Sequence, residues 1–224
     1  VDPALAPQRI MWTYQTDASF DPVAADHVVV SSPYMQRVVA GRQPAAASRL
    51  HVIPYGIDPT EFDGDVVRDP HLVLFASTPE RGLYELLSIW PRVLAARPAA
   101  RLRCTYGWDA FLAGGGTPQI ATAADRLVAS MPTVSVGRVS RAELNTLYRT
   151  AGVWAYYCTG GESFCISGIK AQHAGCVPVV KPWGGLHDTV RAGLEGWEES
   201  DSCEAPFSSE RGGKTREPVP QVGR

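Results

Sequence analysis

The sequence AGVWAYYCTGGESFCISGIKAQHAGCVPVV at residues 151–180 decides the fold of this chain. Its two ends are apolar, and the runs at 152–157 and 177–181 predict buried strands. Between them, a double-glycine turn is followed by residues 163–174, which predict a short helix. A strand, a helix and a second strand in this order predict a parallel β-α-β unit, because parallel neighbours need a crossover connection.

The same alternation continues on the amino-terminal side of this unit. Ser140 with Glu143 three residues later predicts a helix that begins with a capping box. Alternating helices and apolar strands predict an α/β fold: a Rossmann-like parallel sheet with helices on both faces. Ligands bind beyond the carboxyl ends of the strands in such sheets, so the turns after Phe75, Val136 and Tyr157 are of interest. The expected strands cover 71–76, 101–106 and 133–136, and the expected helices cover 83–97, 119–130 and 140–150.

Both ends of the chain differ from this regular block. Residues 191–224 are polar, rich in Glu, Ser, Gly and Arg, and predict a disordered tail. Residues 63–70 are also polar and predict a linker. Upstream of this linker, the expected strands lie at 9–14, 26–31 and 49–53, and the expected helix lies at 34–40.

Composition excludes several classes of function. The 224 residues, 45% of them hydrophobic, suffice for one sizeable core or for one domain plus part of another. A net charge of −2 gives no electrostatic footprint for nucleic acid, and no run of about 18 apolar residues predicts a spanning helix. The five cysteines lack CxxC spacing, which predicts neither a disulfide framework nor a metal site and favours a cytoplasmic location. A GxGxxG turn and a P-loop are absent from the sequence as well.

Three charged residues lie at the expected strand ends, which we expect to be adjacent. A helix beginning near Ser163 exposes free N–H groups and a positive dipole end, which suit a diphosphate. Glu162 at this helix can accept hydrogen bonds from a sugar or stabilise positive charge at an anomeric carbon, or it can simply cap the helix. Arg81 can hold phosphate oxygens bidentately or lie on the surface, and Arg138 has the same two interpretations.

Four segments together carry a resemblance to a known family: PYGID at 54–58, FASTPERGL at 75–83, GRVSRAELNTLY at 137–148 and ESFCISGIKAQHAGCVPV at 162–179. They resemble, in order, the PNGID linker, the basic-Gly donor-phosphate turn, the G-x-V-x-x-x-E-L-x-x-x-Y block and the E-x-F-G donor motif. These are motifs of retaining glycosyltransferases of the GT-B fold, family 4. The four segments are far more specific together than any one of them.

The resemblance implies two Rossmann-like domains with a cleft between them, and a chain truncated at both ends. Residues 1–48 are expected to be a remnant of the amino-terminal, acceptor-side domain. Residues 49–190 are expected to bind the nucleotide sugar, and 191–224 to form the divergent tail. The implied reaction, of hexosyltransferase type, transfers a sugar with retention from a nucleotide-diphosphate sugar, the co-substrate, to an unknown saccharide, lipid or protein. No cofactor or metal is implied, and we expect little activity from this chain alone.

The resemblance also assigns roles to individual residues. Glu162 is expected to be catalytic beside the donor sugar. The second glutamate of the family falls at position 170, where this chain has Lys170, and an ammonium cannot accept hydrogen bonds from ribose hydroxyls. The alternatives are therefore a non-catalytic nucleotide-sugar-binding module with a degenerate donor site, or a plain interaction domain. The expected donor-binding residues are Arg81, Gly82, Arg138, Gly161, Ser163, Phe164, Cys165, Ile166 and Lys170.

Overall fold

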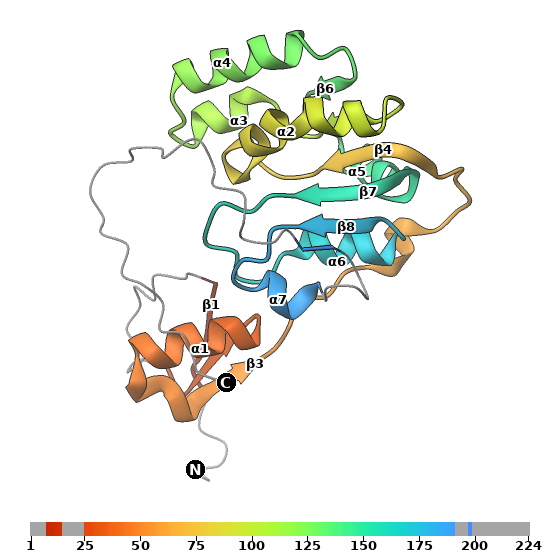
Figure 1. The fold of residues 1–224 in the computed structure, drawn as a ribbon. Coiled ribbons are helices and arrows are strands. Elements are labelled where there is room, and N and C mark those ends of the chain that lie inside the picture. Colours follow the sequence, from red (N-terminus) through yellow and green to blue (C-terminus); the bar gives the residue numbers. More distant parts are fainter. Residues whose placement is uncertain (1–7, 15–24, 191–196, 199–224) are drawn as a thin grey trace, which may run out of the picture.

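The computed structural model describes residues 8–14, 25–190 and 197–198, which form two parallel sheets (Figure 1). The smaller sheet has the order β1-β2-β3, and the larger has the order β6-β5-β4-β7-β8-β9. The smaller sheet comprises β1 (Ile10–Thr13), β2 (His27–Val30) and β3 (Leu50–Val52). The larger comprises β4 (Asp69–Phe75), β5 (Arg101–Cys104), β6 (Val134–Val136), β7 (Ala151–Tyr156), β8 (Val177–Val180) and β9 (Trp197–Glu198).

Helices form two groups beside the larger sheet. The first group is α2 (Leu83–Ala96), α3 (Trp108–Ala113) and α4 (Pro118–Ala129), in which α4 contacts both α2 and α3. The second is α5 (Arg141–Thr150), α6 (Ile166–His173) and α7 (Leu186–Thr189). The strand order reverses between β4 and β7, as in doubly wound sheets, and right-handed crossovers then send later helices to the other face. The predicted Rossmann-like fold is confirmed.

The core of the larger unit forms where α2 packs on the sheet. Leu83, Leu86, Leu87 and Trp90 lie at helical spacing and are all buried. Each such side chain contributes about 1.5–3 kcal/mol through removal of its apolar surface from water. The indole Nε1 of Trp90 donates to Thr133 Oγ1 at 3.1 Å, so the buried ring leaves no unpaired donor.

The predicted capping box at the start of α5 is confirmed. Ser140 Oγ accepts a hydrogen bond from the Glu143 amide at 3.2 Å, and Glu143 Oε2 accepts one from the Ser140 amide at 2.8 Å. Each hydrogen bond satisfies an amide that the first helical turn leaves without a partner.

Helix α6 begins three residues later than predicted. The expected start was Ser163, but the helix runs from Ile166 to His173. The side chain of Glu162 accepts hydrogen bonds from the amides of Phe164 and Cys165, and Cys165 adopts a left-handed φ of 69°. These two features hold the chain in a loop up to Cys165.

Helix α3 was not predicted, since the glycine-rich run that follows it indicated a loop. The sequence predicts a helix over residues 186–192; helix α7 ends at Thr189, and residues 191–192 lie outside the described residues. Of residues 191–224, which the sequence predicts to be a disordered tail, only 197–198 are among the described residues, and Trp197–Glu198 pairs with β8.

The smaller unit consists of β1, β2 and β3, helix α1 (Pro33–Arg42) and the short helix η3 (Pro44–Arg49). Strand β3 pairs with β2, although residue 49 was the expected start of the second domain. The chain therefore crosses from the smaller sheet to the larger sheet after Val52, because its pairing with β2 places β3 in the smaller sheet. One buried cluster joins the strands to α1: Val28, Val30, Met35, Val39 and Leu50.

Candidate functional site

The carboxyl ends of β4 and β7 form the topological switch point of the larger sheet. Arg81 lies in the short helix η5 (Pro79–Arg81) after β4, and Glu162 lies in the loop after β7. The structure brings these two predicted residues together: Arg81 Nη1 lies 2.9 Å from Glu162 Oε2. An ion pair therefore occupies the position where ligands bind in folds of this kind.

Both oxygens of the Glu162 carboxylate have hydrogen-bond donors from the protein. Oε2 accepts from Arg81 and from the hydroxyl of Tyr156 at 3.1 Å. Oε1 accepts from the amides of Phe164 at 3.3 Å and Cys165 at 3.0 Å. The residue is only 8% exposed, and a buried carboxylate requires this degree of satisfaction. Glu162 thus holds the loop before α6, but it does not cap that helix, whose N-cap residue Cys165 has no side-chain cap; its contact with a donor sugar stays a prediction.

Arg81 has hydrogen-bonding capacity to spare. Burial works against its charge, but the neighbouring Tyr156 and Glu162 oxygens outweigh burial and raise the pKa of Arg81. Among the described residues, only its Nη1 has acceptors, so Nε and Nη2 keep donors for an anion. Its side chain is 42% exposed, which leaves a charged guanidinium within reach of a ligand.

Gly82 allows the turn after Arg81 to lie directly on the end of β7. Its φ is +103°, and a Cβ there would lie 1.7 Å from the carbonyl oxygen of Tyr157. No residue with a side chain fits this position. The predicted site residue Gly82 therefore holds Arg81 close to the Glu162 loop.

The loop that carries Glu162 is fixed by residues that the sequence did not indicate. Ser32, which follows β2 in the smaller sheet, donates its hydroxyl proton to the Ser163 carbonyl at 2.7 Å. The Gly185 amide donates to the Glu162 carbonyl at 2.8 Å. The ring of Phe164 meets Tyr55 edge to face, with 5.5 Å between centroids. These partners are distant in sequence, so local patterns carry no signal for them.

Of the remaining predicted residues, Arg138 lies apart from the ion pair, whereas Gly161 and Ile166 lie at the two ends of the loop that carries Glu162. The expectation that three charged residues share neighbouring strand ends is corrected for Arg138, because β5 separates β6 from β4. Gly161 forms the left-handed turn before Glu162, with a φ of 57°. Ile166 is the first residue of α6 and is exposed.

Lys170 pairs with a carboxylate that lies outside the Glu162 loop. Its Nζ lies 3.7 Å from Oε2 of Glu61, in the short helix η4 (Pro59–Phe62), and both side chains are 20% exposed. Glu61 also accepts hydrogen bonds from Arg141 and, at 3.3 Å, from Asn145 Nδ2. Lys170 therefore has a protein counterion, and its predicted contact with the donor stays a prediction.

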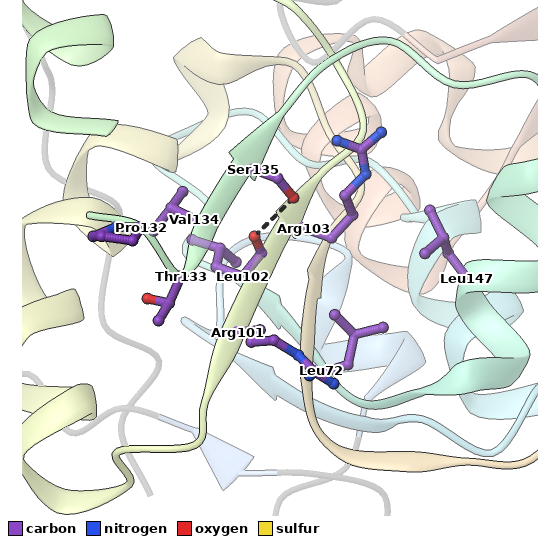
Figure 2. Close-up of a pocket in the computed structure, with 9 residues that line it drawn as sticks. All are labelled: Leu72, Arg101, Leu102, Arg103, Pro132, Thr133, Val134, Ser135 and Leu147. Carbon is purple, nitrogen blue, oxygen red and sulfur yellow. Dashed lines mark hydrogen bonds between the residues drawn. The ribbon is translucent and has the colours of Figure 1, made fainter. Parts of the chain in front are cut away.

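A pocket of about 260 Å³ lies elsewhere, beside β4, β5, β6 and α5 (Figure 2). Arg101 and Arg103 extend from β5 in different directions in this view, so they do not converge on one anion. Arg101 is paired with Asp69. The pocket contains none of the predicted site residues; it is lined by Leu72, Arg101, Leu102, Arg103, Pro132, Thr133, Val134, Ser135 and Leu147.

The described residues lack two further features. None of their helices is long and apolar enough to cross a membrane. Within the same ranges, no three His, Cys, Asp or Glu side chains gather to hold a metal ion.

No protein-family model matches the sequence, and no curated protein sequence matches it. Solved structures do match the fold. HepE from Anabaena, crystallised with UDP and glucose, has a TM-score of 0.67 and 16% identity, covering 84% of this chain and 57% of HepE. This chain has the fold of the GT-B glycosyltransferases.

Other GT-B structures agree with this fold. A glycosyltransferase from Rickettsia africae has a TM-score of 0.64 and 15% identity, covering 77% of this chain and 48% of its own. The pneumococcal O-GlcNAc transferase GtfA, in complex with UDP and GlcNAc, has a TM-score of 0.58 and 18% identity, covering 83% of this chain and 35% of GtfA. The chain thus spans less than two thirds of each of these neighbours.

Proposed function

We propose that this chain is the donor-binding part of a retaining glycosyltransferase of family 4 and binds a nucleotide-diphosphate sugar. The observation that carries the proposal is the Arg81–Glu162 pair at the switch point of the larger sheet. The fold of known glycosyltransferases supports it, as does the presence of UDP in the HepE and GtfA structures. The sugar would be a hexose, the acceptor a saccharide, lipid or protein, and the location cytoplasmic.

Arg81 and the start of α6 supply the groups that a diphosphate needs. The Nε and Nη2 donors of Arg81 suit phosphate oxygens in a bidentate arrangement. The amides of Ile166 and Ser167 begin α6 and have no acceptor among the described residues, so they add backbone donors and the positive dipole end. The amides of Phe164 and Cys165 do not join them, because Glu162 already occupies both.

A second candidate is a nucleotide-sugar-binding module without catalysis. Two observations favour it: the Glu162 carboxylate is satisfied by four protein donors, and Lys170 is paired with Glu61. In this case the same donor ligand binds, but Glu162 holds the loop and takes no part in a reaction.

Calorimetric titration of the chain with UDP-, GDP- and ADP-glucose tests donor binding. We expect one of the three to bind and Arg81→Ala to weaken that binding about 10- to 100-fold, the effect of a lost charged hydrogen bond. The matched control is Arg92→Ala, which removes an exposed arginine of α2. If none of the three ligands binds, or if both variants weaken binding equally, both candidates fail.

Product analysis separates the two candidates only through the residual activity, because we expect little activity from this chain alone; it is therefore run at high protein concentration and long incubation. A retaining transferase releases a product with the anomeric configuration of the donor, which NMR of the released sugar reports. A binding module gives no sugar release above the level of the Glu162→Gln variant. Lys170→Glu, titrated alongside, tests the predicted donor contact of this residue, because a contact with the ligand predicts a changed Kd.

A further inference from the structure

The first helix of the smaller unit begins directly against the Glu162 loop of the larger unit. Ser32 is the N-cap residue of α1, and its hydroxyl oxygen accepts a hydrogen bond from the amide of Met35 at 3.1 Å. The same hydroxyl donates its proton to the carbonyl of Ser163 at 2.7 Å. One fully buried hydroxyl therefore caps α1 and also holds the residue that follows Glu162.

A turn of two glycines before α7 encloses the same part of the loop. The Gly185 amide donates to the Glu162 carbonyl at 2.8 Å, and a Cβ on Gly185 would lie 2.3 Å from the Ser163 carbonyl oxygen. A Cβ on Gly184 would lie 2.3 Å from the Glu162 carbonyl oxygen. The backbone of the turn thus lies against both carbonyls. Among the described residues, the hydroxyl of Ser32 is the only donor to the Ser163 carbonyl, so its removal leaves that acceptor without a partner.

A second contact holds α1 against the same turn. The amide of Tyr34 lies in the first turn of α1, where backbone N–H groups have no partner within the helix, and it donates to Oδ2 of Asp188 in α7 at 2.7 Å. The carboxylate also lies at the positive end of the helix dipole. The ring of Tyr34 lies beside Gly184, since a Cβ there would be 3.1 Å from the ring. The amino-terminal end of α1 is therefore attached to the larger unit at two points.

The position of the loop determines which groups face a nucleotide sugar. The Glu162 carboxylate pairs with Arg81, and the loop runs from Glu162 directly into α6. A displacement at Ser163 therefore moves both the guanidinium and the amides of Ile166 and Ser167. These are the hydrogen-bond donors that the proposed function assigns to the diphosphate.

We propose that Ser32 is a positioning residue of the donor site. Through Ser163 it holds the Glu162 loop in the conformation that presents Arg81 and the start of α6 to a nucleotide-diphosphate sugar. Ser32 itself does not contact the ligand, because both hydrogen bonds of its hydroxyl are made with the protein. The proposal rests on the proposed function, which supplies the ligand, but the hold on the loop can be measured without any ligand.

Ser31 provides a matched control in the same segment. Ser31 and Ser32 are adjacent and fully buried, but Ser31 Oγ has no hydrogen-bond partner among the described residues. Ser31→Ala therefore removes a buried hydroxyl without removing a hydrogen bond. Ser32→Thr keeps the hydroxyl, and Ser140→Ala removes the N-cap of α5, a different helix. These variants separate the hydrogen bond to Ser163 from lost volume and from a lost helix cap.

Hydrogen exchange of the full chain, followed by mass spectrometry, measures the hold on the loop. The amides of Phe164 and Cys165 report on it, because both donate to the Glu162 carboxylate. We expect Ser32→Ala to speed their exchange about fivefold or more, as for loss of one buried hydrogen bond. Exchange in strand β5 should not change, because it reports on the core of the larger sheet.

Calorimetry with UDP-, GDP- and ADP-glucose measures the effect on the donor site. We expect Ser32→Ala to weaken binding of the nucleotide sugar that binds about fivefold or more, since the donors of the site lose their fixed position. Ser31→Ala, Ser32→Thr and Ser140→Ala should bind it within about twofold of the original chain. Rescue by threonine is the result that a merely structural role of this position would not give.

Equal loop exchange in Ser32→Ala and Ser31→Ala would refute the hold on the loop. Faster exchange with unchanged affinity would refute the positioning role, because the loop could then move at no cost to the site. Binding weakened equally in Ser140→Ala would trace the effect to a general loss of stability and overturn the proposal. If the original chain binds none of the three nucleotide sugars, the proposed function and the positioning role fail together, and the exchange rates still decide whether Ser32 holds the loop.

Discussion

The substitution Glu162→Gln tests whether this carboxylate holds the loop at the switch point. The carboxylate accepts from Arg81 and Tyr156 through one oxygen and from the amides of Phe164 and Cys165 through the other. A glutamine amide has a single acceptor oxygen, so its NH₂ group must face one of these two pairs of donors. Whichever way the amide points, the charge on Arg81 loses its counterion.

The magnitude follows from the burial of the two partners. Removing one member of a fully buried ion pair costs about 3–5 kcal/mol, whereas an exposed pair contributes about 0–1 kcal/mol. Glu162 is buried, but the side chain of Arg81 is 42% exposed, so water replaces part of what is lost. We therefore expect Glu162→Gln to lower the free energy of unfolding by about 2–3 kcal/mol, out of a total of about 5–15 kcal/mol.

Urea unfolding followed by tryptophan fluorescence measures this loss. The double variant with Arg81→Ala completes a mutant cycle, and we expect a coupling energy of about 1–2 kcal/mol between the two residues. A cost below about 0.5 kcal/mol, within the range of ordinary surface substitutions, would refute the structural role of the carboxylate. Unchanged stability with abolished sugar transfer would instead assign Glu162 to catalysis.

Three other predictions concern the neighbouring elements. Lys170→Glu places two carboxylates at the site of the Lys170–Glu61 pair, and we expect a loss of about 2 kcal/mol in urea unfolding. Added salt should reduce the difference in unfolding free energy between Lys170→Glu and Lys170→Gln, because salt screens the repulsion between the two carboxylates. A difference that salt leaves unchanged would contradict this electrostatic explanation. Ser140→Ala removes the side-chain cap of α5 and should cost about 1 kcal/mol, so an unaltered midpoint of thermal unfolding argues against the capping box. Cys165→Val puts a β-branched residue at a left-handed φ and should lower the free energy of unfolding by about 2–3 kcal/mol. The control Cys104→Val lies in a strand and should lower it by less than half as much. Equal losses in the two variants would exclude backbone strain as the cause.

Local patterns in the sequence determined the helices and strands, and the strand ends at which charged site residues lie. The alternation of apolar strands with helices predicted the parallel sheet, and Ser140 with Glu143 predicted the start of α5. Arg81 and Glu162 were indicated because each follows an apolar strand. These signals are short-range: periodicity and caps act within a few residues, so the sequence displays them directly.

Tertiary structure alone decided which of these residues meet. Arg81 and Glu162 are 81 positions apart and form an ion pair only because β4 and β7 are neighbours, whereas Arg138 is set apart by β5. The start of α6 moved to Ile166 because the Glu162 side chain, buried and charged, takes up two backbone amides. The stacking of Trp12 on Tyr55 and the edge-to-face contact of Tyr55 with Phe164 join three segments that share no local pattern. Pairings of this kind follow from strand order and from the need to satisfy buried charges, and neither is written in the spacing of residues along the chain.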